Sequence, residues 1–473
     1  MVFSSIIFLF YFLPMVLVLY YTVGKYSIGF RNLLLLAASL LFYAWGEPEY
    51  IWLLILSCLF NWAAAWLVDS RRSRAKFWLT VSVIGNLGVL FVMKYWDFVM
   101  GNLNSIVRAE VFPILNLSLP IGISFYTFQA MSYVIDVYRK DAAVQKNPLY
   151  VALYISLFPQ LVAGPIIRYN TVERQILERT HSWDTFSKGC VRFVQGLAKK
   201  LVLANSFAVI ADNIFLMTRA GHTVMQIPVT LAWLGSFAYT FQIFFDFSAY
   251  SDMAIGLGQM FGFEFEENFR YPYISRSIGE FWRRWHISMG TWFREYVYIP
   301  LGGSRNGGGR MVRNLFIVWL LTGLWHGAGW NFLLWGMLNF LFIFAERLFD
   351  LEKREGGRIW RHIYTLLTVN LGWVLFRCED FYQLQEYLGN MLWRNQNGFL
   401  SPYTWMFLKE YAWFWLAGIV LCMPAGAVAR GQLKKAAPGL ERALYLVGMM
   451  ALLILSVVLL AKSGYNPFIY FNF

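Results

Sequence analysis

The sequence predicts an all-α, polytopic integral membrane protein, and three observations support this prediction. Of the 473 residues, 58% are hydrophobic and only 14% are charged, whereas soluble domains carry about 25% charged residues. Aromatic residues make up 19% of the chain, with 21 Trp, 27 Tyr and 43 Phe. The apolar residues arrive in runs of about 20, the length that crosses a hydrocarbon layer roughly 30 Å thick. We therefore expect a bundle of transmembrane helices.

Thirteen apolar segments are candidate spans. They lie near residues 3–24, 30–46, 50–68, 77–95, 117–137, 148–167, 198–217, 227–247, 313–330, 331–347, 362–378, 411–429 and 443–461. Several are short or interrupted, so we expect about eleven to thirteen transmembrane or re-entrant helices. The first run, Phe3 to Val23, lacks the basic n-region and the small-residue cleavage site of a secretory signal, and we interpret it as a retained span.

Basic residues are concentrated in every second predicted loop of the N-terminal part. They are Lys25 and Arg31 after the first span, Arg71, Arg72, Arg74 and Lys76 after the third, and Arg139, Lys140 and Lys146 after the fifth. The turn over residues 46–49 has no Lys or Arg. Because cytoplasmic loops carry the excess of Lys and Arg, the N-terminus is predicted to lie outside. The net charge of +13 is thus spread over loops that face anionic lipid, which disfavours a nucleic-acid partner.

The stretch 171–200 is more polar than the segments around it. Lys188, Arg192, Lys199 and Lys200 stand among apolar residues at helical spacing, which is typical of an interfacial helix on the cytoplasmic face. We find no linker, internal repeat or low-complexity tract in the chain. We therefore predict a single transmembrane domain over residues 1–473.

Polar residues concentrate between about 240 and 335, within otherwise apolar surroundings. Asp246 and Asp252 stand in a phenylalanine-rich stretch, and Asn331 follows the last polar motif. An ionisable group in or near a bilayer is costly, so each one is a functional-site candidate. Pairing of either aspartate with an arginine is the alternative.

Five histidines narrow the search for a catalytic base. Three of them, His181, His222 and His362, are interpreted as solvated loop or helix-start residues. His326 lies in an apolar segment beside Gly323 and Gly327, where small residues allow close approach. It would share a helix face with Thr322 and Trp330. A neutral imidazole here could accept a proton from a hydroxyl; a core histidine that bonds to a neighbouring helix is the alternative.

The second candidate histidine, His286, follows two arginines and two tryptophans. The arginines, Arg283 and Arg284, could neutralise a phosphate group. The indoles of Trp282 and Trp285 could bury an acyl chain or stack on a ring. An interfacial belt of aromatic and arginine side chains is the alternative interpretation.

Several catalytic motifs are absent from the sequence. The glycine-rich loop over residues 302–310, which contains Arg305, lacks the Gly-Lys-Ser/Thr ending and the preceding strand of a P-loop, so a cytoplasmic turn is the better interpretation. There is no His-Glu-x-x-His and no Gly-x-Ser-x-Gly motif. The four cysteines are far apart, and we predict no metal site and no disulfide framework.

Three longer motifs point to a known family. They are FWRRWHIS at Phe281–Ser288, YIPLGG at Tyr298–Gly303 and GLWHGAGW at Gly323–Trp330, supported by Val2–Ser5, Pro120–Gln129, Phe158–Pro165 and Phe468–Phe471. On these residues the sequence resembles the membrane-bound O-acyltransferase (MBOAT) family. The resemblance is strongest to its bacterial alginate O-acetylation branch and weaker to the teichoic acid D-alanyl transferases.

The resemblance implies a fold and a site. The family fold is a ring of transmembrane helices around a thinned centre, with a tunnel that brings a cytoplasmic acyl thioester to a hydroxyl acceptor from the other side. His326 matches the family's catalytic histidine, and His286 matches a second functional position. The chain departs from its relatives at Glu295, where they have Asp, and at Met289-Gly290, where an aliphatic-Ser pair is usual. These departures affect any role of Glu295 and the width of the acyl pocket.

Together these observations predict an O-acyltransferase in the cytoplasmic membrane of a bacterium. It would move an acetyl group from acetyl-CoA or a phosphopantetheine carrier to an extracytoplasmic hydroxyl, for O-acetylation of a cell-surface or exported polysaccharide. His326 would act as the base, and His286 would orient the donor or polarise its carbonyl. The candidate substrate-binding residues are Trp282, Arg283, Arg284, Trp285, Trp325, Asp246, Asn331 and Arg305. No tightly bound cofactor is expected.

The resemblance also implies a partner, an extracytoplasmic SGNH-type transferase that passes the acetyl group to the polysaccharide. Three alternatives stay open at this point. They are D-alanyl transfer to teichoic acid, a transporter or flippase for a polysaccharide precursor, and a non-catalytic scaffold of a cell-envelope assembly.

Overall fold

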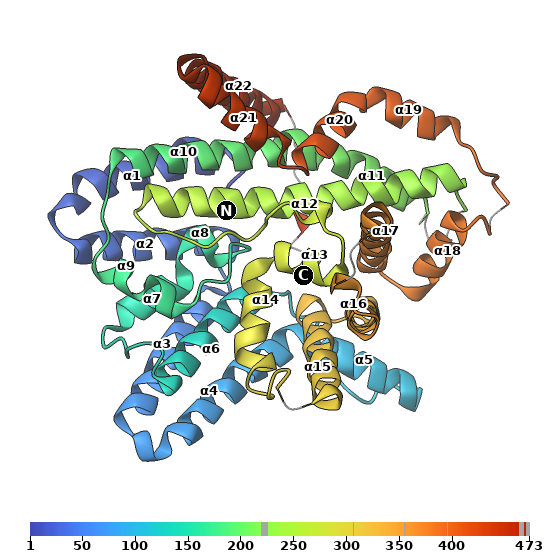
Figure 1. Ribbon diagram of the computed structural model, residues 1–473. Helices are drawn as coiled ribbons and strands as arrows, with labels where there is room; N and C mark the ends of the chain where they lie inside the picture. The colour runs from blue at the N-terminus through green and yellow to red at the C-terminus, as the bar shows by residue number, and fades with distance from the viewer. Residues whose placement is uncertain (219–225, 306, 354–355, 395, 463–467, 470–473) are drawn as a thin grey trace. The chain divides into compact units, whose positions relative to one another are not determined.

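The computed structural model describes residues 1–218, 226–305, 307–353, 356–394, 396–462 and 468–469. All regular secondary structure within these ranges is helical, which confirms the predicted all-α class (Figure 1). The chain divides into two compact units, one formed by Met1–Phe193 with Tyr250–Glu266 and the other by Val194–Ala249 with Glu267–Phe473. The single domain over residues 1–473 stays a prediction.

The first unit is built from the N-terminal helices. They are α1 (Leu13–Thr22), α2 (Ile28–Gly46), α3 (Ile51–Ser70), α4 (Ala75–Leu90), α5 (Trp96–Val107), α6 (Ile123–Arg139), α7 (Pro148–Ser156), α8 (Phe158–Leu161), α9 (Tyr169–Leu177), most of α10 (Trp183–Ala198) and the end of α12 (Val229–Met260). Local sequence explains where several begin. Ser27 caps α2 by accepting a hydrogen bond from the Phe30 backbone N–H, and Asn147 caps α7 directly before Pro148.

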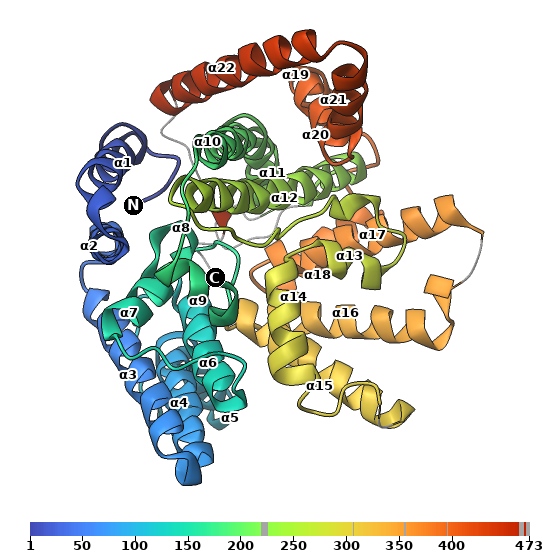
Figure 2. The same cartoon turned by 60° about the vertical axis from the view of Figure 1, so that its left-hand side comes forward.

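The second unit holds the remaining helices. They are α11 (Asn205–Met217), the first part of α12, α13 (Ile278–Arg284), α14 (Ile287–Phe293), α15 (Gly308–His326), α16 (Trp330–Leu348), α17 (Arg358–Arg377), α18 (Phe381–Met391), α19 (Pro402–Glu410), α20 (Ala412–Leu421), α21 (Ala425–Ala436) and α22 (Pro438–Lys462). Figure 2 shows α15 and α16 next to each other and α20, α21 and α22 in succession. A Cβ on Gly323 of α15 would lie 2.6 Å from the Phe332 carbonyl oxygen. Glycine there permits the close approach of the two helices.

Seven described helices are long and apolar enough to cross a membrane. They are Phe8–Tyr26, Ile28–Gly46, Ile51–Ser70, Arg72–Val107, Trp183–Met217, Trp330–Leu348 and Pro438–Lys462, and the bent pair Ala412–Leu421 and Ala425–Ala436 would make eight. The other predicted segments are helical but shorter or more polar. Segment 117–137 begins its helix only at Ile123, and segment 148–167 breaks into α7 and α8. Many spans are thus confirmed, whereas the count of eleven to thirteen transmembrane or re-entrant helices and the outside N-terminus stay predictions.

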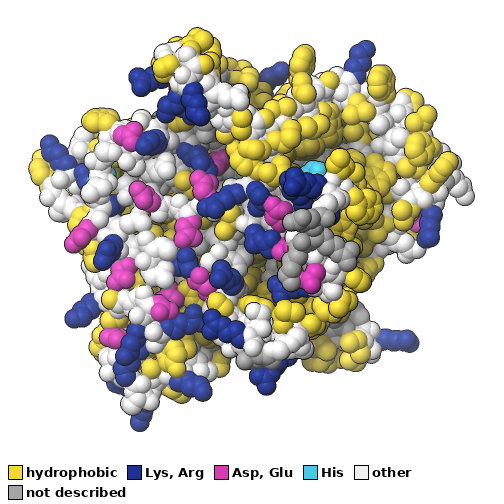
Figure 3. Space-filling model, viewed as in Figure 1, with side chains coloured by type: hydrophobic (Ala, Val, Ile, Leu, Met, Phe, Trp, Pro, Cys, Tyr) yellow, Lys and Arg dark blue, Asp and Glu magenta, His cyan; other side chains and the backbone are white. Residues whose placement is uncertain are grey.

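The surface of the helices near the C-terminus matches this membrane assignment. Trp405 on α19 and Trp413 on α20 are 71% and 80% exposed. Figure 3 shows hydrophobic side chains on much of the visible surface over these two helices. Apolar surface of this extent would be unfavourable in water and is favourable against lipid.

The segment 171–200 differs from its prediction as one helix. Helix α9 ends at Leu177, and α10 starts at Trp183, after Ser182 has accepted a hydrogen bond from the Thr185 backbone N–H at 3.1 Å. This side-chain cap starts a second helix. Helix α10 then continues through a π-turn at Lys199–Ala204 into α11. The single helix is therefore wrong, and the interfacial position stays a prediction.

Candidate active site

His326 is the last residue of α15 and is 3% exposed. Its ring meets Trp335 edge-on with a centroid separation of 4.9 Å, and Phe376 at 5.3 Å. The helix ends here because Gly327 takes an extended backbone conformation. The imidazole thus lies at a helix terminus, within aromatic surroundings contributed by α16 and α17.

His286 lies at the junction of α13 and α14 and is fully buried. Its backbone has φ 46° and ψ 53°, a left-handed conformation that costs a non-glycine residue of order 1–3 kcal/mol. The ring packs edge-on against Phe247 at 4.7 Å. The sharp turn aims the imidazole into the protein interior, where the surrounding structure compensates the strain.

A hydrogen-bond network sets the tautomer of His286. Nδ1 lies 3.2 Å from Asn268 Oδ1, and the same oxygen accepts hydrogen bonds from the Ser288 backbone N–H and hydroxyl. Because Oδ1 can only accept, Nδ1 must carry the proton. The helices α13 and α14 lie outside the candidate spans, and burial lowers the pKa of His286 to about 3. The ring is therefore neutral, with a lone pair on Nε2.

Trp325 brings the two candidate histidines together. Its ring centroid is 5.9 Å from that of His286 and 5.0 Å from that of His326, and its side chain is buried. The structure therefore places these three predicted site residues in one cluster within the second unit. Their catalytic roles stay predictions.

Trp282 and Trp285 belong to the aromatic packing around this cluster. The Trp282 Nε1–H donates to Asn339 Oδ1 at 2.8 Å, and its ring meets Trp335 at 5.4 Å. Trp285 is buried against Trp373 at 4.9 Å. These contacts hold α13 against α16 and α17, so both indoles support the wall around the histidines.

Glu346 is a positioning residue that the sequence interpretation missed. Its carboxylate accepts hydrogen bonds from the backbone N–H groups of Ile278 and Gly279, at 2.5 and 2.9 Å. These N–H groups belong to the first turn of α13, where they have no partner within the helix. A carboxylate near the end of a predicted apolar span was the signal that could have identified it.

The three arginines predicted to bind substrate have different surroundings. Arg283 is exposed and pairs with Glu352 at 2.8 Å. Arg284 pairs with Glu280 at 2.9 Å and donates to the Arg270 carbonyl oxygen. Arg305 is exposed in the turn after Tyr298. A phosphate at Arg283 or Arg284 would compete with a carboxylate, and binding by these residues stays a prediction.

The two aspartates pair with basic residues. Asp252 lies 2.6 Å from Arg192, as the pairing alternative expected. Asp246 lies 2.6 Å from Lys200, and the side chains of Asp246 and Lys200 are only 2% and 3% exposed. Asp246 also accepts a hydrogen bond from the Ile469 backbone N–H at 2.8 Å. A substrate role for Asp246 therefore stays a prediction that must compete with a structural ion pair.

Asn331 also has a structural partner, because its amide donates to the Cys378 carbonyl oxygen at 3.0 Å. His362 lies 3.0 Å from the Ser275 carbonyl oxygen. His222 lies outside the described residues. His181 lies in the loop between α9 and α10 and is partly exposed, but its ring is not fully solvated, since Tyr20 and Arg31 each lie 2.8 Å away.

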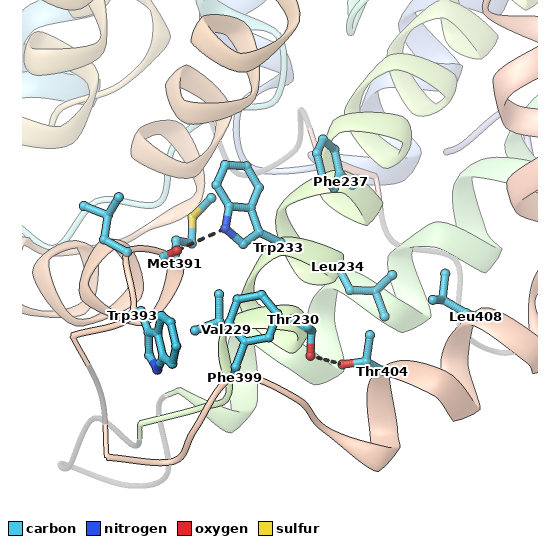
Figure 4. A pocket seen from close by; sticks show the side chains of 11 residues that line it. Val229, Thr230, Trp233, Leu234, Phe237, Met391, Trp393, Phe399, Thr404 and Leu408 are labelled. Carbon is cyan, nitrogen blue, oxygen red and sulfur yellow. Dashed lines mark hydrogen bonds between the residues drawn. The ribbon is translucent and has the colours of Figure 1, made fainter. Parts of the chain in front are cut away.

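A pocket in the second unit has a volume of about 500 Å³. It is lined mostly by apolar side chains from the start of α12, the end of α18 and α19 (Figure 4). The Trp233 indole donates to the Met391 carbonyl oxygen at 3.0 Å, and Thr230 bonds to Thr404 at 3.0 Å. No predicted site residue lines this pocket, so it does not define the candidate active site.

Comparison with known proteins places this site in a family context. Residues 75–378 match the membrane-bound O-acyltransferase family. The chain is 45% identical over 401 residues to the probable alginate O-acetylase AlgI of Pseudomonas putida, a match that covers 83% of this chain and 80% of the relative.

Two further relatives are more distant. The chain is 34% identical over 430 residues to the peptidoglycan O-acetyltransferase of Helicobacter pylori, with 84% and 80% covered. It is 26% identical over 347 residues to the teichoic acid D-alanyltransferase of Bacillus subtilis, with 69% and 84% covered. The family match includes both clustered histidines.

Proposed function

Because the chain belongs to the membrane-bound O-acyltransferase family, we propose that this O-acyltransferase moves an acetyl group from a thioester donor to hydroxyl groups for O-acetylation of a cell-surface or exported polysaccharide. The relatives with the higher identities are an alginate O-acetylase and a peptidoglycan O-acetyltransferase, which supports acetyl as the acyl group. Membership of this family favours the enzyme over the transporter and scaffold alternatives.

The observation that carries the mechanism is the packing of two buried histidines against Trp325. In the proposed step, His326 accepts the proton of the acceptor hydroxyl while the hydroxyl oxygen attacks the thioester carbonyl carbon. The C–S bond then breaks, and the proton passes to the departing thiolate. A base positioned in this way contributes roughly 10²–10⁴ in rate.

The tautomer of His286 refines its predicted role. Nδ1 donates to Asn268, so the neutral ring offers a lone pair at Nε2. It can accept a hydrogen bond from a hydroxyl or an amide, but it cannot polarise a carbonyl by donating from Nε2. We therefore assign it the role of orienting a substrate donor group beside His326.

The finer features of the reaction follow the family resemblance. The donor is acetyl-CoA or an acetylated phosphopantetheine carrier on the cytoplasmic side, and the acceptor reaches the site from the opposite side of the bacterial cytoplasmic membrane. An extracytoplasmic SGNH-type transferase completes the transfer to the polymer. D-alanyl transfer is the second candidate, supported only by the relative at 26% identity.

The test measures acyl transfer from radiolabelled acetyl-CoA in membranes that contain the wild type, His326→Ala, His286→Ala or His362→Ala. His362 lies apart from the proposed machinery, near the start of α17, and serves as the matched control. We expect label in polysaccharide or partner protein with the wild type and His362→Ala, and none with His326→Ala.

Wild-type turnover in His326→Ala would contradict the assignment of the base. If the wild type transfers no label from acetyl-CoA, the assay is repeated with an acetylated carrier protein as the donor and with an added extracytoplasmic transferase. Label that appears only with a D-alanylated carrier would replace acetyl transfer with D-alanyl transfer.

A further inference from the structure

A buried basic cluster lies in the first unit, where the ends of α1, α9 and α12 meet the start of α2. Arg179 is 8% exposed, and its Nε donates to the Tyr20 hydroxyl at 2.8 Å and to the Phe261 carbonyl oxygen at 3.1 Å. The terminal nitrogen Nη1 of Arg179 donates to Asn32 Oδ1 at 2.6 Å. Arg31 lies on the same cluster and contacts His181 at 2.8 Å.

The two guanidinium groups share one aromatic ring. The central carbons of Arg31 and Arg179 lie 5.1 and 5.7 Å from the Tyr20 ring centroid. The ring attracts each cation, but its hydroxyl and face carry no net negative charge. The stacking therefore positions two positive charges close together without neutralising either of them.

Within the described residues, every hydrogen-bond partner of these two arginines is neutral. His181 adds no negative charge, and burial together with Arg31 and Arg179 lowers its pKa to about 4, so its ring is neutral near pH 7. The cluster thus holds two uncompensated positive charges, one of them on a largely buried side chain. Buried charges in proteins are ordinarily paired.

Two buried donors of the cluster also have no acceptor among the described residues. They are Arg31 Nε and one terminal nitrogen of Arg179. The Phe261 carbonyl oxygen, just after α12, accepts from Arg179 Nε and so does not satisfy this terminal nitrogen. Leaving such donors unsatisfied is costly, and a bound anion would compensate the positive charge of the cluster.

One side of the cluster is partly exposed. Arg31 and His181 are partly exposed, whereas Arg179 lies at the base. Gly262 borders the cluster with φ +81°, and a Cβ there would lie 3.0 Å from His181 Nε2. Because Gly262 has no side chain, the backbone at this position can pack directly against His181.

We propose that Arg31 and Arg179 form a binding site for a phosphate group, with Tyr20 and His181 as its neutral walls. Two guanidinium forks match the several acceptor oxygens of a phosphate, and charge-assisted contacts of this kind are the strong ones. The phosphate belongs either to a lipid headgroup or to a soluble molecule such as a nucleotide-containing thiol. The site is distinct from the histidine cluster and does not depend on the proposed function.

The test uses the full-length protein purified in detergent, with Arg31→Gln, Arg179→Gln and the control Arg174→Gln. Arg174 is exposed on α9 and carries the same charge. Thermal unfolding is followed while inorganic phosphate, short-chain phosphatidylglycerol or coenzyme A is titrated, with sodium chloride at equal ionic strength as the reference. A ligand that binds the folded state raises Tm in proportion to its occupancy.

We expect at least one phosphate probe to raise the Tm of the wild type and Arg174→Gln, with about tenfold weaker binding in Arg31→Gln. Tightest binding of phosphatidylglycerol identifies a headgroup site, and tightest binding of coenzyme A or inorganic phosphate identifies a soluble ligand.

Two results would overturn the proposal: no probe stabilises the wild type beyond sodium chloride, or Arg31→Gln binds as tightly as the wild type. Arg31→Gln is decisive if Arg179→Gln does not fold, because Arg31 is partly exposed and, among the described residues, its side chain hydrogen-bonds only to His181.

Discussion

The ion pair between Lys200 and Asp246 provides a quantitative test of whether Asp246 supports the fold or binds substrate. Their charged atoms lie 2.6 Å apart, and the side chains are only 3% and 2% exposed. The replacement Asp246→Asn keeps the shape and an oxygen that can accept from the Ile469 backbone N–H, but removes the negative charge. Lys200 would then face a neutral amide in a buried environment.

Breaking a buried pair by neutralising one partner costs about 3–5 kcal/mol, because the remaining charge stays desolvated. Unfolding entropy is about 2.1 cal/mol/K per residue, or roughly 1 kcal/mol/K for a chain of this length. The expected fall in Tm is therefore about 3–5 °C. Thermal unfolding of the detergent-purified protein measures this shift.

Two matched variants complete the test. Lys200→Met/Asp246→Asn removes both charges and should be more stable than Asp246→Asn alone. Asp252→Asn should cost less, because its partner Arg192 is 30% exposed and water can solvate the remaining charge. An Asp246→Asn protein with wild-type Tm but no acyl transfer would refute the structural role and favour substrate binding.

Three further predictions concern pH, a helix start and a helix crossing. In phosphate-free buffer, the free energy of unfolding should decrease as pH falls from about 6.5 towards about 4. The reason is that the pKa of His181 is lowered to about 4 in the folded protein, so the unfolded chain binds the proton first. Tm against pH measures this, and His181→Gln should flatten that part of the curve. Glu346→Ala should lower the free energy of unfolding by about 1–3 kcal/mol, since the Ile278 and Gly279 N–H groups lose their acceptor. Denaturant unfolding measures this change, and an unchanged midpoint would argue against a stabilising role of Glu346 at the start of α13. Gly336→Ala should also destabilise by about 1–3 kcal/mol, because the added Cβ would collide with the Trp319 carbonyl oxygen; an equally stable variant would show that α15 and α16 can separate.

The histidines show how far residue type alone leads. His326 and His286 were candidates because an imidazole in apolar surroundings is costly and chemically useful. Their burial and their common contact with Trp325 became visible only in the fold. His181 was interpreted as a solvated residue within the polar stretch 171–200, but its partners Tyr20 and Arg31 lie 161 and 150 residues away. Local polarity did not reveal these distant contacts.

The segment 171–200 shows a related limit of pattern analysis. Helical spacing of charged and apolar residues predicted helix correctly, but not the break at Ser182 or the continuation of α10 into α11. A side-chain cap such as Ser182 can begin a new helix without disturbing the hydrophobic period. Periodicity therefore predicted the type of element better than its boundaries.

The sequence by itself determined the membrane class, the all-α structure, the family and the two histidine candidates, because hydrophobicity, run length and side-chain chemistry are properties of the residues in order. Only the tertiary structure decided which groups meet. It paired Asp246 with Lys200 and placed Arg31 and Arg179 around Tyr20. It also brought the carboxylate of Glu346, on α16, to the first turn of α13. The physical reason is that ion pairs and hydrogen bonds act over a few ångströms, between residues that the chain separates by tens to hundreds of positions.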